Sequence, residues 1–411
     1  MDAYKYVIIG GGLAGGSAAE AIRQVDPQGS LVLVTQEHHR PYHRPPLSKS
    51  FLQGKKELEG VFLQDEEYYQ SQHIDLLTDT RALVLDRANR TVSLDNGQTL
   101  RYDRLLLATG ARAWRLPLPG NDLDQVLTLR TVEDSQRIRD AGGKGRRALI
   151  LGGSFIGSEV AMSLAQLGTH VTMAFPRARL MARIAPPEFS EWLESMYREQ
   201  GVRVLTGTTA ERLEGDGQVA RAVLDNGETL DVDLVVMGVG IRLNTGLAQG
   251  AGLALGEAGA VLVDEYLRTS DANIYAAGDI AAWPDQVFDK RLRVEHWDVA
   301  QNQGIRAGRN MAGDEAPYTV MPYFFSDLFD LSLEVWGDID SWDQTVLRGS
   351  LEEGSYAFYY FDGGKLTGVM AVGRPDEERG PMQSLIKQRL AYKRSAEKLE
   401  NEQVTLASLL A

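Results

Sequence analysis

The stretch YVIIGGGLAGGSAAEAI, residues 6–22, decides the fold. An apolar strand runs directly into a turn that carries Gly10, Gly12 and Gly15, and a helical pattern follows at once. The first glycine of this spacing allows a tight turn, the second lets the backbone approach a pyrophosphate, and the third lets the helix pack on the strand. A flexible glycine turn is the alternative, but it would need neither the strand nor the helix. The stretch therefore predicts a βαβ unit that binds a dinucleotide.

A carboxylate is expected about 20 residues after such a turn, where it accepts hydrogen bonds from ribose hydroxyls. After the strand LVLVT, residues 31–35, the chain offers Gln36 and then Glu37. Glu37 is the predicted ligand, with the register open by one residue.

The same pattern of strand, glycine turn, helix and strand recurs at residues 147–175. Gly152 and Gly157 occupy the first and third glycine positions, but Ser154 takes the middle one. The serine either loosens nucleotide binding or offers its hydroxyl to a phosphate. This repeat predicts a second dinucleotide-binding unit.

The second unit lacks the expected ribose carboxylate. At the end of its second strand, VTMAF, Phe175 takes the place of the expected carboxylate, and Arg177 and Arg179 follow. Arginine beside a ribose 2′-phosphate favours NADPH. Alternatively, both arginines are ordinary surface charges and the nucleotide binds weakly. The choice between NADH and NADPH stays open at this point.

Composition narrows the function classes. The 411 residues allow two or three domains, and no apolar run approaches the ~20 residues of a membrane span. The N-terminus enters a strand at once, without a signal region, so the cytoplasm is the expected location. A net charge of -14 argues against a nucleic-acid surface. The chain has no cysteine, so it can form no disulfide, cysteine-ligated metal site or thiolate nucleophile, and no metal site is predicted.

Further elements surround the two repeats. The stretches at residues 90–103 and 222–235 each place an Asn-Gly pair between alternating apolar runs, which predicts a hairpin. From Met321 onward the strands become aromatic, and a basic helical stretch follows from Met382 to Lys398. The predicted fold is α/β, with two doubly wound Rossmann-like dinucleotide-binding domains and a small α+β C-terminal domain.

A specific family resemblance begins at PYHRPPLSK, residues 41–49. It continues through LLLATGAR (105–112), GGSFIGSEVA (152–161), IYAAGD (274–279), VEHWDVAQNQG (294–304) and PYFFSDLFDL (322–331). The whole chain resembles the FAD-dependent ferredoxin reductases of bacterial oxygenase systems, such as putidaredoxin reductase and biphenyl dioxygenase ferredoxin reductase, and also apoptosis-inducing factor. The wider fold is that of glutathione-reductase-like proteins.

The resemblance implies domain boundaries and cofactor contacts. It implies an FAD-binding domain at 1–112 and 244–322, an NAD(P)-binding domain at 113–243 and a C-terminal domain at 323–411. The implied FAD contacts are Gly10, Gly12, Leu13, Ala14, Gly15, Glu37, Arg44, Pro45, Lys49, Ala82, Thr109, Gly110, Arg130, Gly278, Asp279, His296 and Trp297. The implied nicotinamide-nucleotide contacts are Gly152, Gly153, Ser154, Ile156, Gly157, Arg177 and Gly240. Without the family, a Gly-Asp turn, a lone arginine or a capping histidine would need no ligand.

The resemblance also implies a redox centre. Lys49 and Glu159 are expected to meet beside the flavin N5, where the ammonium favours the negative charge of a reduced flavin and the carboxylate orients the lysine. An exposed lysine and a glutamate in the first turns of a helix are the ordinary alternatives. The run of Tyr323, Phe324 and Phe325 departs from the tryptophan-rich form that is usual in the oxygenase reductases, although Phe325 could still pack by the flavin.

The implied function is that of an NAD(P)H-dependent reductase that passes electrons through FAD to a ferredoxin or rubredoxin, as a monomer or homodimer. Because the chain lacks cysteine, disulfide reductases of the same fold are excluded. Two basic clusters could dock an acidic ferredoxin, although solvated charges are the alternative. They are Lys290, Arg291 and Arg293, and Lys387, Arg389, Lys393 and Arg394. The second hypothesis is a redox-sensing protein like apoptosis-inducing factor, in which reduction controls assembly.

Overall fold

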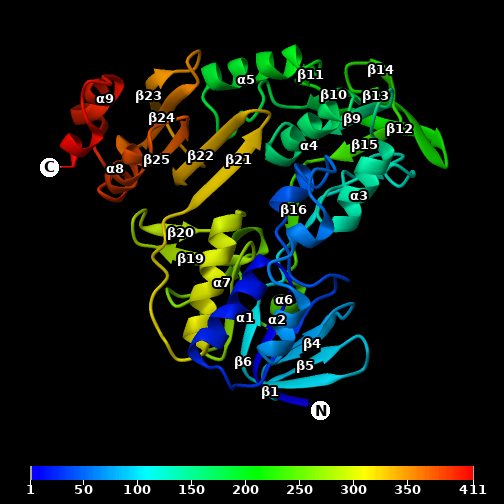
Figure 1. Ribbon diagram of the computed structural model, residues 1–411, viewed down its shortest axis with the longest axis vertical. Coiled ribbons are helices and arrows are strands. Elements are labelled where there is room, and N and C mark those ends of the chain that lie inside the picture. The colour runs from blue at the N-terminus through cyan, green and yellow to red at the C-terminus, as the bar shows by residue number, and fades with distance from the viewer. Residues whose placement is uncertain (1, 411) are drawn as a thin grey trace. The chain divides into compact units, whose positions relative to one another are not determined.

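The computed structural model describes residues 2–410 and divides into two compact units, each formed from several stretches of chain (Figure 1). The first unit contains the chain up to residue 43, then 58–112 and 242–324. The second contains 44–57, 113–241 and the chain from 325 onward. The short strands β7 (Ala111–Ala113) and β16 (Ile241–Leu243) contain two of the points at which the chain passes between units.

The sheet of the first unit is built around the predicted βαβ repeat. Its order is β3 (Ile74–Leu77), β2 (Leu31–Val34), β1 (Asp2–Ile9), β6 (Thr99–Leu107), β5 (Thr91–Leu94) and β4 (Ala82–Asp86), with β18 (Ile274–Ala276) also paired to β6. β1 runs parallel to β2 and β6, with Ile9 opposite both Val34 and Leu107. β5 and β6 pair in antiparallel fashion around Asn96-Gly97, which confirms the first predicted hairpin.

Two helices of the first unit, α1 (Leu13–Val25) and α7 (Trp297–Met311), pack side by side and run parallel (Figure 1). A Cβ atom on Gly304 would lie 2.3 Å from the Ala14 carbonyl oxygen, and one on Gly308 would lie 2.4 Å from that of Ala18. Only glycine permits this approach, because any side chain would separate the two backbones. The spacing of four residues on both helices keeps the contact on one face of each helix.

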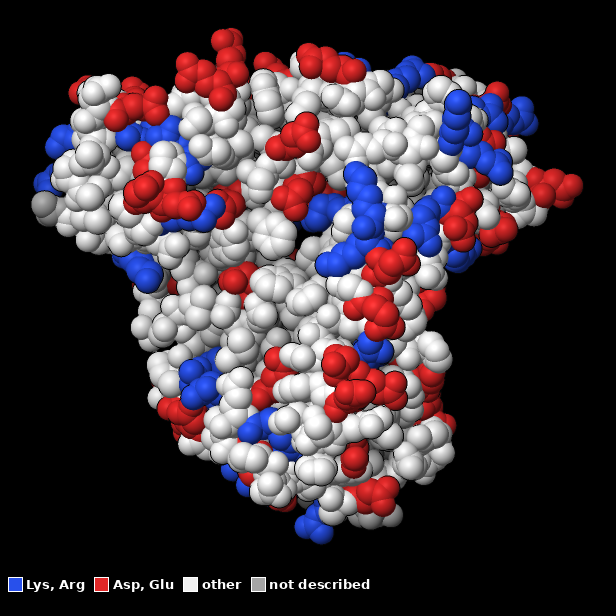
Figure 2. Space-filling view, in the orientation of Figure 1, with Lys and Arg blue, Asp and Glu red and all other residues white. Residues whose placement is uncertain are grey.

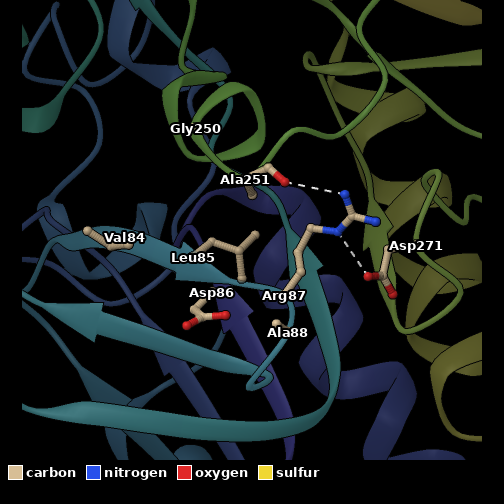
Figure 3. A pocket seen from close by; sticks show the side chains of 8 residues that line it. All are labelled: Val84, Leu85, Asp86, Arg87, Ala88, Gly250, Ala251 and Asp271. Atoms are coloured by element: carbon tan, nitrogen blue, oxygen red, sulfur yellow. Dashed lines mark hydrogen bonds and ion pairs between the residues drawn. The ribbon is translucent and has the colours of Figure 1, made fainter.

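The first unit also contains α2 (Glu66–Ser71), α6 (Gly246–Gly250), β17 (Val261–Leu262), β19 (Ala281–Asp285), β20 (Lys290–Leu292) and the short 3-10 helices Leu58–Val61 and Glu257–Gly259. An open hollow between β4 and α6 is lined by Arg87, whose Nε donates to Asp271 at 3.0 Å (Figure 3). Strand pairing sets the neighbouring Asp86 level with Arg101 and Ala3, at the start of β1. The hollow therefore lies at the opposite end of the sheet from Gly10.

The second unit contains the duplicate. Its parallel sheet has the order β11 (Arg203–Thr206), β10 (His170–Phe175), β9 (Arg147–Leu151), β15 (Leu234–Met237) and β8 (Val126–Leu127), accompanied by α3 (Val132–Ala141), α4 (Phe155–Gln166) and α5 (Pro187–Glu199). An antiparallel sheet of β12 (Ala210–Asp216), β13 (Gln218–Leu224) and β14 (Thr229–Asp231) contains the second predicted hairpin, which is confirmed. A short 3-10 helix, η1 (Pro45–Ser48), packs against α4 and α3.

The C-terminal part of the second unit is an antiparallel sheet with the order β21 (Tyr323–Leu328), β22 (Leu331–Gly337), β25 (Lys365–Val372), β24 (Ser355–Asp362) and β23 (Gln344–Ser350). The helical stretch expected from Met382 to Lys398 is instead two helices, α8 (Asp376–Lys387) and α9 (Tyr392–Glu400), before a last turn at Leu406–Leu409. The break occurs because the Leu390 carbonyl accepts from Leu366 N, and Tyr392 N donates to Gly364, so the chain pairs with β25 between the helices.

The α/β fold class with two Rossmann-like sheets is as predicted. The three domains and their boundaries given above stay a prediction. Within residues 2–410, no helix is both long and apolar enough to cross a membrane. Figure 2 shows acidic and basic side chains interspersed over the face that it draws.

Candidate functional site

The first glycine turn has the geometry that a bound dinucleotide requires. Gly10 has a φ of +122°, and a Cβ there would lie 2.1 Å from the Ala108 carbonyl oxygen. A Cβ on Gly15 would lie 1.9 Å from the carbonyl oxygen of Gly10, so the helix packs directly on the turn. Apart from its own neighbours in the chain, no atom of the described residues lies within 4 Å of a Cβ position on Gly12. Space is thus open at the middle glycine, where a pyrophosphate would approach.

The start of α1 is suited to an anion. Its N-cap residue is Gly12, no side chain caps the helix, and its first turn has no acidic residue. The amides of Leu13, Ala14 and Gly15 belong to the first turn, whose N–H groups have no partner within the helix. Close to this turn, the buried Gln303 accepts from Gly278 N at 2.9 Å, while its Nε2 has no hydrogen-bond partner among the described residues 2–410. These features fit a phosphate-bearing cofactor.

Two further turns surround the same end of the sheet. Gly278, with a φ of +78°, follows β18 and precedes Asp279. Thr109 and Gly110 follow β6, and the Thr109 hydroxyl donates to the Asn244 carbonyl at 2.6 Å. Because β1, β6 and β18 are parallel, their carboxyl ends place Gly10, Thr109 and Asp279 at one edge. These predicted contacts are brought together.

Glu37 lies three residues after the end of β2. Its carboxylate accepts a hydrogen bond from the Tyr42 hydroxyl, and its carbonyl accepts from Asp79 N at 3.2 Å. Tyr42 thus orients the predicted ribose ligand, a role that the sequence gave no reason to expect. Ala82 begins β4, three residues after Asp79, and pairs with Leu94.

His296 and Trp297 stand at the start of α7. His296 is the N-cap residue, and its ring stacks on Phe324 with the centroids 4.0 Å apart. The Trp297 indole Nε1 donates to His43 Nδ1 at 3.1 Å. Burial lowers the pKa of His296 to about 4, and the Asp279 carboxylate opposes this shift only in part. The histidine is therefore neutral at physiological pH.

The second glycine turn repeats the first. Gly152 has a φ of +127°, and a Cβ on Gly157 would lie 2.3 Å from the Gly152 carbonyl oxygen. Ser154 is the N-cap residue of α4, and its hydroxyl makes no capping bond. Ile156 is 41% exposed in the first turn of this helix. The open helix end is thus ready for an anion, with Ser154 beside it.

Two other predicted nucleotide contacts have defined surroundings. Gly153 lies against the buried Phe175, whose ring would be 2.6 Å from a Cβ at Gly153. Gly240 has a φ of +107° and open space at its Cβ position, and its carbonyl accepts from Trp114 N at 2.8 Å.

Lys49 and Glu159 meet within the second unit. Lys49 Nζ lies 3.3 Å from Glu159 Oε1, and the glutamate side chain is 6% exposed. Glu159 also accepts from the hydroxyls of Ser48 and Ser326, the latter at 2.7 Å. A second carboxylate, Asp327, lies 3.8 Å from Lys49 Nζ. We name these five residues the Lys49 cluster.

The Lys49 cluster holds a cation at a fixed place beside an aromatic ring. Lys49 Nζ lies 5.5 Å from the centroid of Phe325, within range of a cation–π contact. Glu159 has its negative charge satisfied by three donors, which is what a buried carboxylate requires. The sequence singled out Lys49, Glu159 and Phe325 but missed Ser48, Ser326 and Asp327. Ser48 directly precedes Lys49, and Ser326 and Asp327 are the two residues after Phe325, which was the available signal.

The remaining predicted residues lie in the second unit or at the surface. Arg44 donates to the carbonyl of Arg130, and Arg130 N donates to Asp134 at 2.9 Å. Pro45 is the first residue of η1. Of the first basic cluster, Arg291 donates to the Val263 and Ala282 carbonyls and Arg293 pairs with Glu295, whereas Lys387, Lys393 and Arg394 of the second are exposed.

Comparisons with known proteins agree with this geometry. The family described as "Pyridine nucleotide-disulphide oxidoreductase" matches residues 4–304, and "Reductase C-terminal" matches residues 323–410. Putidaredoxin reductase CamA of Pseudomonas putida is 34% identical over 90% of this chain and 89% of that protein. The probable ferredoxin reductase CtmF of Castellaniella defragrans is 33% identical over 98% of both chains. The covalent putidaredoxin reductase–putidaredoxin complex matches with a TM-score of 0.92 and 32% identity, over 100% of this chain and 98% of that one.

The packing of Gly15 gives a first prediction. Gly15→Ala puts a methyl group 1.9 Å from the Gly10 carbonyl oxygen, so the helix or the turn must move. We expect the purified variant to retain less than about a tenth of the FAD of the wild type and to lose roughly 1–3 kcal/mol of stability from overpacking. Bound flavin absorbance and thermal unfolding measure the two effects.

Gly250→Ala is the matched control, because this helical glycine has open space at its Cβ position. Alanine there should raise stability by about 0.5–1 kcal/mol and leave FAD content unchanged. Equal FAD content in the two variants would contradict the role assigned to the Gly15 contact.

The pKa of His296 gives a second prediction. In the folded protein this pKa is about 4, against 6.5 in the unfolded chain, so unfolding takes up a proton between these values. The stabilising contribution is therefore complete above pH 6.5 and is lost as pH falls toward 4, by about 1–3 kcal/mol. His296→Phe keeps a ring against Phe324 but cannot titrate. Urea unfolding at pH 7 and pH 5 should show a smaller drop for the variant, and an equal drop in both proteins would disprove the assignment.

Proposed function

Because the chain belongs to the pyridine nucleotide-disulphide oxidoreductase family, we propose that it is an NAD(P)H-dependent flavoprotein that passes electrons through FAD to a ferredoxin. Relatives are named as ferredoxin–NAD(+) reductases of oxygenase systems, for example the benzene 1,2-dioxygenase component of Pseudomonas putida, 34% identical over 90% of this chain and 89% of that protein. FAD is the cofactor, and NADH is the donor that these names support.

One observation carries the proposal. A single chain without cysteine holds two glycine turns, the second with Ser154 in the middle position. Each lies at the carboxyl ends of parallel strands and opens a helix with no side-chain cap. Two such turns suit two dinucleotides, one as resident cofactor and one as donor. Because this chain has no cysteine, no disulfide of its own can take the electrons from the flavin, and the electron acceptor must be a separate molecule.

FAD, when bound, accepts two electrons as hydride and can release them one at a time, which is the conversion that a ferredoxin needs. The protein's share is binding and electrostatics. The α1 amides and Gly12 would hold the pyrophosphate, Glu37 the ribose, and Asp279 a ribityl hydroxyl. His296, being neutral, adds no charge to the site at pH 7.

The Lys49 cluster supplies a cation for the redox centre. We retain the prediction that Lys49 favours negative charge on the reduced cofactor and that Glu159 orients it. The added observation is that Ser48 and Ser326 donate hydrogen bonds to Glu159, and that Asp327 lies 3.8 Å from Lys49 Nζ. A fixed cation costs little reorganisation when charge appears, whereas a mobile lysine would have to be drawn in from water.

The proposal also covers partners, oligomeric state and location. A rubredoxin is the alternative electron acceptor, and neither a nucleic acid nor a membrane is a partner. The protein acts in the cytoplasm as a monomer or homodimer. For docking, the exposed Lys387, Lys393 and Arg394 are better suited than the first cluster, because Arg291 and Arg293 already serve internal contacts.

The redox-sensing alternative is not favoured. Relatives that span nine tenths or more of the chain are named as reductases, and the second glycine turn keeps the shape that nucleotide binding requires. The kinship with apoptosis-inducing factor stays a prediction.

An anaerobic titration tests the proposed function. The purified FAD-loaded protein should lose its visible absorbance on addition of NADH or NADPH, and a [2Fe–2S] ferredoxin should restore it while cytochrome c becomes reduced. Lys49→Met should slow flavin reduction about 10- to 100-fold without loss of FAD. Lys55→Met, an exposed lysine of the same segment, should behave as wild type. A protein that takes up no FAD, or whose reduced flavin is unaffected by ferredoxin, would refute the proposal.

A further inference from the structure

The two glycine-turn units can be superposed residue by residue from their backbone hydrogen bonds. Ile9 lies opposite Val34, and Leu151 lies opposite Ala174. Gly10 N donates to the Val34 carbonyl at 2.8 Å, and Gly152 N donates to the Ala174 carbonyl at 3.0 Å. Val34 and Ala174 are therefore equivalent. Counting three residues onward from each makes Glu37 equivalent to Arg177.

Two independent contacts confirm this equivalence. A Cβ on Gly11 would touch Thr35, and one on Gly153 would touch Phe175, so these side chains correspond. The Glu37 carbonyl accepts from Asp79 N at 3.2 Å, and the Arg177 carbonyl accepts from Gly207 N at 2.9 Å. In both units this donor lies just after the next parallel strand. Phe175 thus corresponds to Thr35, and the residue that replaces the carboxylate is Arg177, which corrects the expectation from sequence.

The replacement reverses the hydrogen bonding as well as the charge. A carboxylate accepts hydrogen bonds from the two ribose hydroxyls of NADH. A guanidinium has no acceptor, but it donates several hydrogen bonds to a phosphate. The segment from Phe175 to Ala185 contains three arginines and no acidic residue.

Two of these arginines are available for a ligand. Arg177 is exposed and makes no side-chain hydrogen bond or ion pair within residues 2–410. Arg179 is half-buried, and its Nε has no hydrogen-bond partner in the same range. The nearby buried carboxylate of Glu194 accepts from Leu180 N at 2.9 Å and pairs with Arg198 instead.

The arginine segment is tied to the nucleotide-binding turn. Met181 N donates to the Gly153 carbonyl at 2.8 Å, so the backbone after Arg179 is bonded to the middle of the second glycine turn. The third arginine, Arg183, pairs with Asp340 at 3.3 Å. Arg177 and Arg179 therefore carry positive charge to the place where an adenosine ribose would lie.

We propose that Arg177, assisted by Arg179, binds the 2′-phosphate of NADPH, so that this chain prefers NADPH to NADH. The inference rests on the proposed function for the donor site and concerns only the choice of donor. It sets this chain apart from relatives that are named as ferredoxin–NAD(+) reductases.

Nucleotide binding without turnover tests the inference. Calorimetry on the FAD-loaded protein would compare adenosine 2′,5′-bisphosphate with AMP, which differ only in the 2′-phosphate. We expect the wild type to bind the bisphosphate about 10- to 100-fold more tightly, because hydrogen bonds between charged groups contribute this much. The advantage should shrink in 0.5 M salt, because the charges are exposed. Equal binding of the two nucleotides, or tighter binding of AMP, would overturn the inference.

Variants locate the effect. Arg177→Glu should abolish the preference and shift kcat/KM toward NADH, while Arg183→Gln, the matched arginine of the same segment, should leave it intact. An equal loss in both variants would overturn the role of Arg177. Rapid reduction by NADH and not NADPH, with ferredoxin reduction intact, would refute the inference and leave the proposed function standing. Failure of FAD uptake or ferredoxin reduction would instead refute the proposed function, and the binding comparison would still decide the choice of donor.

Discussion

The approach of a helix to the carbonyl of its own glycine turn is the constraint on which both halves of this protein depend. Cβ atoms on Gly15 and Gly157 would lie 1.9 and 2.3 Å from the carbonyl oxygens of Gly10 and Gly152. This contact fixes the angle between strand and helix, and hence where the free amides of the first helical turn point. The strand order, the carboxyl edge and the turns at Thr109 and Asp279 are all arranged around that direction. Side chains that the loops place at the carboxyl edge of each sheet are therefore positioned relative to the glycine turn and its helix, and not by the loops alone.

The two βαβ units and the hairpins could be predicted from sequence, because they depend on interactions between residues that are close in the chain. Glycine spacing, strand periodicity and Asn-Gly turns each act over a few residues, and the two βαβ units and both hairpins follow from them. The break between α8 and α9 could not be predicted from sequence, because it depends on backbone hydrogen bonds of Leu390 and Tyr392 to residues at the start of β25. The partners of Glu159 were hidden for the same reason. Ser48 and Ser326 are 111 and 167 residues away in the chain, and only the fold brings them to one carboxylate.

The equivalence of Glu37 and Arg177 could be established only from the structure. Counting along the sequence gave Phe175 as the substitute for the ribose carboxylate, because it ends the strand. The hydrogen bonds from Gly10 N to Val34 and from Gly152 N to Ala174 align the two units by their backbone instead. In this alignment the equivalent of Glu37 is Arg177, two residues after Phe175. The two units thus share one backbone arrangement, while the equivalent side chains of Glu37 and Arg177 have opposite charge. A duplicated fold conserves positions of main-chain atoms more reliably than the number of residues that lead to them.

The division of the chain into interleaved stretches has a consequence for folding. The central sheet of the first unit is complete only when β18, residues 274–276, pairs with β6, and β6 ends at residue 107. At a synthesis rate of about 5–20 residues per second, the edge of β6 waits roughly 10–30 seconds for this partner. During that interval the intervening residues 113–241 are made, and they contain a parallel sheet with its own local contacts. The unit that begins first on the ribosome therefore finishes late, and an unpaired strand edge is exposed to aggregation in the nascent chain.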